Sequence, residues 1–171
     1  MRLSVNDLRV DVRDGTPADV PLLLGFIRQM AAFEKLEVAA TEASLHEALF
    51  GPEAAGRALL VHVDDRPVGY ITYFFTFTSM MGRRALWLDD LYIVPEFRGR
   101  GIGKALMAHL AGLALEKRCA RFEWIVLDWN APAIEFYRGL GARMLPDWKI
   151  CRLEEGQLAA LAGARAGEEA R

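Results

Sequence analysis

The chain has 171 residues, of which 53% are hydrophobic and 26% are charged, and its formal net charge is −2 at pH 7. This balance predicts a single domain over residues 1–171, with a core at about residues 8–153 and a tail at about residues 154–171. A net charge so near zero argues against nucleic acid or an anionic membrane as a partner. Neither a secretion signal nor an apolar run of about 18 residues is present, which predicts a soluble, cytoplasmic protein.

Alternation of apolar and polar residues predicts a first strand over residues 8–12. Apolar residues at helical spacing then predict helices between about residues 20 and 50, separated by a break, and a capping box at Thr41 begins the second of them. Two further strands, over residues 58–63 and 68–77, are separated by a tight-turn sequence. They predict an antiparallel hairpin.

The second half of the chain alternates strands with helices. The predicted elements are a strand over residues 85–94, a helix over 102–117, a strand over 122–127, a short helix over 131–141 and a last strand over 148–153. In the tail, Leu158 and Leu161 predict a loose helix that then frays.

Cysteines and histidines are the candidate redox and metal-binding residues. Cys119 and Cys151 stand outside any CxxC or Cys/His cluster, so we expect reduced, buried thiols. His46, His62 and His109 lack the spacing of metal ligands. We therefore expect no metal cofactor.

A glycine-rich loop, residues 98–104, joins the strand at 85–94 to the helix that follows it. Uncovered backbone N–H groups at a helix N-terminus bind anions, so this loop predicts a phosphate site. A P-loop is excluded because Ala105 follows Gly103-Lys104 where Ser or Thr is needed. A dinucleotide fingerprint is excluded because the glycines run Gly-x-Gly-x-Gly. A tight turn without a ligand is the alternative.

The loop resembles motif A of the GNAT superfamily of N-acetyltransferases, in which Gln/Arg-x-x-Gly-x-Gly/Ala binds the pyrophosphate of acetyl-CoA; here the pattern is Arg98, Gly101 and Gly103. The order of predicted elements over residues 8–153 also matches that fold. The resemblance implies an α/β (α+β) fold with a mixed sheet of about six or seven strands and about four helices. In that fold the fourth and fifth strands splay apart, and the pantetheine arm pairs with the exposed strand edge.

The segment over residues 130–142 resembles a second family pattern, Asn-x-x-Ala-x-x-Phe-Tyr-x-x-x-Gly-Ala. The resemblance implies that Asn130 and Ala133 contact the cofactor and that Tyr137 protonates the departing sulfur. A core aromatic beside Phe136 is the alternative for Tyr137. The implied cofactor-binding residues are Leu91, Tyr92, Ile93, Arg98, Gly99, Arg100, Gly101, Ile102, Gly103, Lys104, Asn130, Ala133 and Tyr137.

Asp89 and Asp90 stand inside an otherwise apolar strand. Neighbouring strand residues point to opposite faces, so at most one of the two faces a substrate unless a bulge re-aims them; the family carries a bulge in this strand. Burying two carboxylates is costly, which favours a solvated or cation-binding cleft. A structural salt bridge or a strand-end cap is the alternative.

Residues 74–77, 88–92 and 127–130 resemble the diamine (spermidine/spermine) and thialysine acetyltransferases in particular. In that subgroup a glutamate helps to deprotonate and bind the amine, and the shorter Asp89 takes its place here. The same resemblance implies a homodimer.

The resemblance further implies that Glu34 and Glu37 hold a distal amine, with a solvated helix face as the alternative. The loop at residues 78–81 lacks the Asp and Trp of polyamine enzymes, which favours a primary amine, such as a lysine-like side chain.

The sequence therefore predicts an acetyl-CoA-dependent N-acetyltransferase that acts by direct attack of a small cationic amine. Asp89 would accept or relay the amine proton, Tyr137 would protonate the thiolate, and Glu34, Glu37, Asp89 and Asp90 would bind the substrate. The alternatives are an enzyme of the same fold that acts on proteins or peptides and a non-catalytic acyl-CoA-binding module.

Overall fold

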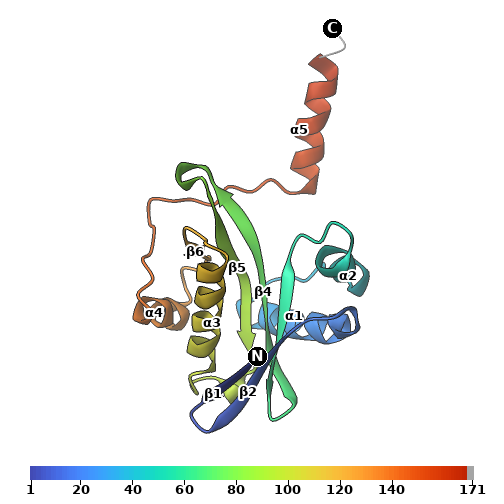
Figure 1. Ribbon diagram of the computed structural model, residues 1–171. Helices are drawn as coiled ribbons and strands as arrows, with labels where there is room; N and C mark the ends of the chain where they lie inside the picture. Colours follow the sequence, from blue (N-terminus) through green and yellow to red (C-terminus); the bar gives the residue numbers. More distant parts are fainter. Residues whose placement is uncertain (169–171) are drawn as a thin grey trace. The chain divides into compact units, whose positions relative to one another are not determined.

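The structure, a computed structural model that describes residues 1–168, contains a six-stranded mixed sheet (Figure 1). The strands lie in chain order, and only the last pair, β5 and β6, is parallel. Their bounds are β1 Arg2–Val5, β2 Leu8–Asp14, β3 Arg57–Val63, β4 Arg66–Thr78, β5 Arg83–Ile93 and β6 Phe122–Glu123. The mixed sheet agrees with the predicted fold class.

The described residues also form five α-helices: α1 Val20–Glu34, α2 Glu42–Phe50, α3 Ile102–Glu116, α4 Ala131–Gly139 and α5 Glu155–Glu168. Short 3-10 helices are η1 Pro17–Asp19, η2 Ser79–Met81 and η3 Pro95–Phe97. Helix α1 packs against α2 and β4, whereas α3 packs against β5 and β1 (Figure 1). In the described part of the chain, no helix is long and apolar enough to cross a membrane.

The chain forms two compact units, Met1–Leu127 and Asp128–Arg171. The first contains the sheet and α1 to α3, and the second contains α4 and α5. The core of the first unit is built from side chains that are fully buried, among them Leu23, Leu60, Tyr70, Leu86 and Leu106. Each such side chain contributes about 1.5–3 kcal/mol through removal of apolar surface from water.

Locally encoded elements agree with the sequence predictions. Strands β3 and β4 form the predicted antiparallel hairpin, and Asp64 and Asp65 in its turn both have positive φ, as a type I′ turn requires. The Thr41 capping box is present, because the Thr41 hydroxyl accepts from Ser44 N–H and Ser44 Oγ accepts from Thr41 N–H. The predicted break between the helices begins at Lys35, which ends α1 in the left-handed conformation.

A strand before residue 8 is missing from the prediction. Strand β1 pairs with β2 through a turn at Asn6 and Asp7, both with positive φ. Leu3, Val5 and Leu8 alternate with polar residues on either side of this Asn-Asp pair, which is a hairpin pattern that could have revealed the strand.

In the second half, one predicted strand is shorter than expected and another does not form. The strand predicted over residues 122–127 is limited to Phe122–Glu123, because its pairing with β5 ends there. The strand predicted over residues 148–153 does not form: within the described part of the chain these residues make no sheet ladder, and a strand without a paired neighbour leaves its backbone groups unsatisfied. Both cysteines are less buried than expected: Cys151, in this segment, is exposed, and Cys119, after α3, is half-buried.

The predicted helix of the tail is α5, in which Leu158 and Leu161 are exposed. The predicted fraying at the end of the tail lies outside the described residues.

Gly69 permits the close approach of β4 to β5. A Cβ at this position would collide with the Tyr92 carbonyl oxygen and come within 2.7 Å of Ile93 Cδ1. Replacing Gly69 by alanine should therefore lower the free energy of unfolding by about 2 kcal/mol, because the two strands must separate. Gly112 in α3 is a matched control, because a Cβ there meets nothing within 4 Å.

Gly112→Ala should raise the free energy of unfolding by about 0.5–1 kcal/mol, since alanine has the higher helix propensity. Urea-induced unfolding followed by circular dichroism measures both changes. Similar effects of the two substitutions would contradict this account of the β4–β5 contact.

Candidate active site

A β-bulge aims the two adjacent aspartates at one pocket. Thr72 on β4 lies opposite Asp90 on β5, but the next residue, Tyr73, lies opposite Leu88. Asp89 is therefore the extra residue of the bulge, which interrupts the alternation of strand side chains. Both Asp89 and Asp90 line the same pocket. Both carboxylates could face a substrate only if the strand carried a bulge, and β5 contains that bulge.

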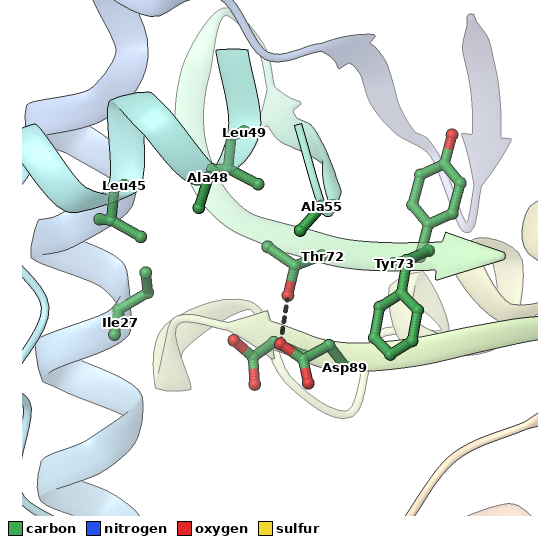
Figure 2. A pocket seen from close by; sticks show the side chains of 11 residues that line it. Ile27, Leu45, Ala48, Leu49, Ala55, Thr72, Tyr73 and Asp89 are labelled. Atoms are coloured by element: carbon green, nitrogen blue, oxygen red, sulfur yellow. Dashed lines mark hydrogen bonds between the residues drawn. The ribbon is translucent and has the colours of Figure 1, made fainter. Parts of the chain in front are cut away.

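The pocket has an apolar wall opposite the aspartates. The volume of the pocket is about 410 Å³. Figure 2 shows Leu45, Ala48 and Leu49 of α2, with Ile27 of α1, on the side facing Asp89. A ligand with a cationic group and an aliphatic chain matches this lining, because the carboxylates attract the cation and the wall removes apolar surface from water.

Asp90 is the more buried of the two aspartates. Its Oδ2 accepts a hydrogen bond from the Tyr70 hydroxyl at 2.9 Å. Burial, together with the neighbouring charge of Asp89, raises the pKa of Asp90 to about 6, although the Tyr70 hydrogen bond opposes this shift. Burial also raises the pKa of Tyr70 far above its ordinary value, so this hydroxyl stays protonated and donates.

Asp89, the extra residue of the bulge, is more exposed to solvent than Asp90. The Thr72 hydroxyl approaches its Oδ2 at 3.5 Å, a long hydrogen bond (Figure 2). Desolvation of its carboxylate raises the pKa of Asp89. Among the residues the structure describes, no lysine, arginine or histidine forms an ion pair with Asp89 or Asp90. The described residues therefore do not provide the salt bridge of the alternative, and those that line the pocket include no lysine, arginine or histidine.

Glu34 extends the negative field of the cleft from the end of α1. It is half-buried, and burial raises the pKa of its carboxyl. Its charge in turn contributes to the raised pKa of Asp90 and of Tyr70. Glu37 lies beyond the helix on an exposed segment and does not line the pocket.

The glycine loop has the backbone geometry of an anion site. Gly99 and Gly101 both have positive φ, at 72° and 86°, and Gly101 is the N-cap of α3. The Ala105 N–H donates to the Gly101 carbonyl at 3.1 Å, so the N–H groups of Ile102, Gly103 and Lys104 precede the first helical hydrogen bond. These groups lie at the positive end of the helix dipole, where a phosphate is stabilised.

Arg98 ties this loop to the end of β5. Its Nε donates to the Ile93 carbonyl at 2.8 Å, and its guanidinium lies over the rings of Phe33 and Tyr92, at 5.1 Å and 5.4 Å. The Tyr92 hydroxyl in turn donates to Gln29 Oε1 at 3.2 Å. Strand, loop and α1 are thereby held together at this point.

One edge of β5 is open beside the bulge. Pairing with β6 ends at Trp87 and Glu123. From Leu88 to Ile93, β5 has no partner strand on that side within the described residues. The fourth and fifth strands of the family fold, which were expected to splay apart, are β5 and β6 here, and the end of their pairing agrees with that expectation. The open edge of β5 leaves backbone groups that an amide-containing arm can pair with.

The second unit carries the remaining predicted residues. Asn130 caps α4, with its Oδ1 accepting from Ala133 N–H at 3.3 Å. Tyr137 is half-buried on α4, and its ring centroid lies 5.2 Å from that of Phe136. Sequence reasoning missed the pocket residue Thr72 and also Tyr70, whose hydroxyl donates to Asp90, although their period-two spacing on β4 places them on one face of the sheet.

Along β5 the structure therefore combines a negatively charged cleft, an open strand edge and an anion-binding helix terminus. These three features in this order define an acyl-coenzyme A-dependent N-acyltransferase. The described residues contain no group of three or more His, Cys, Asp and Glu suited to a metal ion. The chain belongs to the Acetyltransferase (GNAT) family, whose sequence model matches residues 26–142.

The sequence aligns with those of known acetyltransferases over most of its length. It is 34% identical over 165 residues to thialysine N-epsilon-acetyltransferase of Sus scrofa, covering 89% of this chain and 96% of that protein. It is 27% identical over 197 aligned positions to L-ornithine N5-acetyltransferase of Arabidopsis thaliana, covering 88% and 86%.

Solved structures share the fold. An integron cassette protein from the mobile metagenome of V. cholerae superposes with a TM-score of 0.74 at 27% identity, covering 90% of this chain and 97% of that one. Ribosomal-protein-alanine N-acetyltransferase from Brucella melitensis superposes with a TM-score of 0.70 at 22% identity, covering 84% and 99%, which is a likeness of fold.

The Tyr70 hydrogen bond predicts a measurable change in Asp90. In Tyr70→Phe the carboxylate loses its buried donor, so the pKa of Asp90 should rise above its value of about 6. Tyr73→Phe is the matched control on the same strand, and it should leave this titration unchanged. The ¹³C chemical shift of the Asp90 carboxyl, followed against pH by NMR, measures both variants. An unchanged or lower pKa in Tyr70→Phe would contradict this assignment.

Proposed function

We propose that this protein transfers the acetyl group of acetyl-CoA to the primary amine of a small cationic molecule. The observation that carries the proposal is the bulge at Asp89, which puts two carboxylates in one pocket, where neither forms an ion pair with any residue that the structure describes. Membership of the acetyltransferase family and similarity to thialysine and ornithine acetyltransferases support it.

The amine must lose a proton because only the neutral form is a nucleophile. Asp89 is the more accessible carboxylate and would accept this proton, directly or through water. Asp90, with a pKa of about 6, is largely ionised at neutral pH and would hold the ammonium form before transfer. Asp89 passes this first proton to solvent, the nitrogen bonds to the thioester carbon, and the carbon–sulfur bond breaks. The second proton that the nitrogen must lose to become an amide also passes through Asp89 to solvent.

The departing thiolate needs a proton, which the Tyr137 hydroxyl would donate before it is reprotonated from solvent. Acetyl-CoA supplies the activated acyl group. Backbone groups of residues 91–93 would hold its pantetheine arm and polarise the thioester carbonyl, and residues 98–104 would bind its pyrophosphate. Asn130 and Ala133 would add contacts from α4.

Glu34 and Glu37 would hold a second charged group of the substrate at the outer end of the cleft. Glu34 is suited to this role because its charge already acts on Asp90. The apolar wall over Ala48 would contact the carbon chain between the two charges. A lysine-like amine has this arrangement, and the names of the thialysine and ornithine relatives point to the same class.

We further infer a cytoplasmic homodimer. The tip of the β4–β5 hairpin supports a contact between copies, because Phe77, Met80 and Met81 are 73%, 94% and 54% exposed. Apolar side chains gathered this way on a projecting hairpin favour burial against a partner.

The substrate class is tested by release of thiol from acetyl-CoA with lysine, thialysine, ornithine, putrescine, spermidine and a short lysine peptide. We expect turnover of a free lysine-like amine in preference to the peptide. Tyr137→Phe should lower kcat about 100-fold, because proton donation to the leaving group is lost, while the Kd for coenzyme A stays the same. Turnover of the peptide alone would overturn the proposal in favour of a protein-modifying enzyme, and unaltered kcat in Tyr137→Phe would remove this tyrosine from the reaction.

The two aspartates are tested through the pH dependence of kcat/KM. In the wild-type enzyme kcat/KM should rise with pH through about 6, because binding of the ammonium form needs ionised Asp90 and its folded pKa is about 6. Asp90→Asn should abolish this step, and Asp89→Asn should lower kcat about 100-fold. Asp65→Asn is the matched control, because Asp65 lies in the exposed β3–β4 turn. If the rise of kcat/KM near pH 6 persisted in Asp90→Asn, it would have to be assigned to a group other than Asp90.

A further inference from the structure

The N-terminal hairpin reaches the glycine loop. Strand β1 pairs with β2 in register from Arg2 with Asp11 to Val5 with Leu8, and Val12 N–H donates to the Met1 carbonyl at 2.8 Å. An ion pair between Arg2 and Asp11, at 3.0 Å, joins the same two strands. The hairpin is thus fixed to the sheet at its open end, and its turn projects toward α3, against which β1 packs.

The turn of this hairpin contacts the loop at two adjacent residues. Asn6 Nδ2 donates to the Arg100 carbonyl at 3.1 Å, across 94 positions of sequence. At the next residue, a Cβ on Gly101 would lie 3.2 Å from Val5 Cγ1 and 3.4 Å from Asn6 Nδ2. Hairpin and loop are therefore packed closely where Gly101 begins α3 with positive φ.

We propose that Asn6 is a positioning residue for the coenzyme A pyrophosphate. By binding the Arg100 carbonyl, the Asn6 amide fixes the orientation of the peptide unit between Arg100 and Gly101. The N–H of that unit points away from its carbonyl, because a trans peptide places the two groups on opposite sides. Holding the carbonyl toward the hairpin therefore directs the Gly101 N–H away from it, as a donor for the phosphate. This inference rests on the proposed binding of acetyl-CoA by residues 98–104.

The geometry of the turn makes Asn6 suited to this role. Asn6 and Asp7 both occupy the left-handed region, with φ of 46° and 63°, and asparagine adopts this conformation more readily than most residues. The Asn6 amide also carries donors that an isosteric aspartate lacks. A neutral donor next to a phosphate site adds no repulsion, whereas a carboxylate at the same place would repel the phosphate.

The test compares two glycine substitutions in one turn. Asn6→Gly removes the amide and keeps the positive φ, and Asp7→Gly makes the same backbone change without touching the loop. Calorimetric titration with coenzyme A should give a Kd about five- to tenfold weaker for Asn6→Gly, as loss of one hydrogen bond and of loop order implies. For Asp7→Gly the Kd should be unchanged or slightly tighter, because this substitution also removes a carboxylate near the phosphate site. Asn6→Asp should weaken binding at least as much as Asn6→Gly.

A second readout separates positioning from a general structural effect. S-acetylpantetheine lacks the pyrophosphate, so kcat/KM with this donor should be the same in wild type and Asn6→Gly, while KM for acetyl-CoA rises and kcat does not change. Equal coenzyme A affinity in Asn6→Gly and Asp7→Gly, or equal losses with the two acetyl donors, would overturn the inference and leave the proposed function intact. Failure of the wild-type protein to bind coenzyme A would instead overturn both the role of Asn6 and the proposed function.

Discussion

The bulge at Asp89 is the constraint on which the rest of the site depends. In a regular strand Asp89 and Asp90 would point to opposite faces, and one of them would enter the core of the sheet. The extra residue against β4 instead brings both carboxylates into one pocket, at the cost of interrupted pairing. Burial, and then the neighbouring charge of Asp89, raise the pKa of Asp90 to about 6, because the ionised carboxylate lacks a cation to stabilise it.

Strand β5 orders the parts of the site. The carboxylates lie at the bulge, the open backbone edge follows toward Ile93, and the positive end of the α3 dipole lies just beyond. A donor molecule with a phosphate at one end and a reactive acyl group at the other therefore meets opposite electrostatic conditions along a single strand. This separation of charge favours one direction of binding, because a phosphate near Asp89 and Asp90 would be repelled.

Contacts around the site hold this arrangement in place. Tyr70 fixes the carboxylate of Asp90 from β4, and Arg98 joins the end of β5 to the aromatic end of α1. Gly69 lets β4 approach β5 closely beside Tyr92. Tyr70 and Gly69 bind no substrate atom in the proposed mechanism, yet both limit how far the strands that carry the site can move. Such preorganisation is where much of an enzyme's rate enhancement comes from.

Features that depend on near neighbours could be read from the residues themselves. The anion-binding loop, the Thr41 cap and the Asp64–Asp65 turn follow from glycine or aspartate conformations and from side chains a few residues away. The bulge, the apolar wall from α2, the early end of β6 and the missing strand at residues 148–153 depend on partners distant in sequence, so periodicity alone could not reveal them. Asn6 and Arg100 are the clearest case, because only the folded sheet brings two residues 94 positions apart within hydrogen-bonding distance.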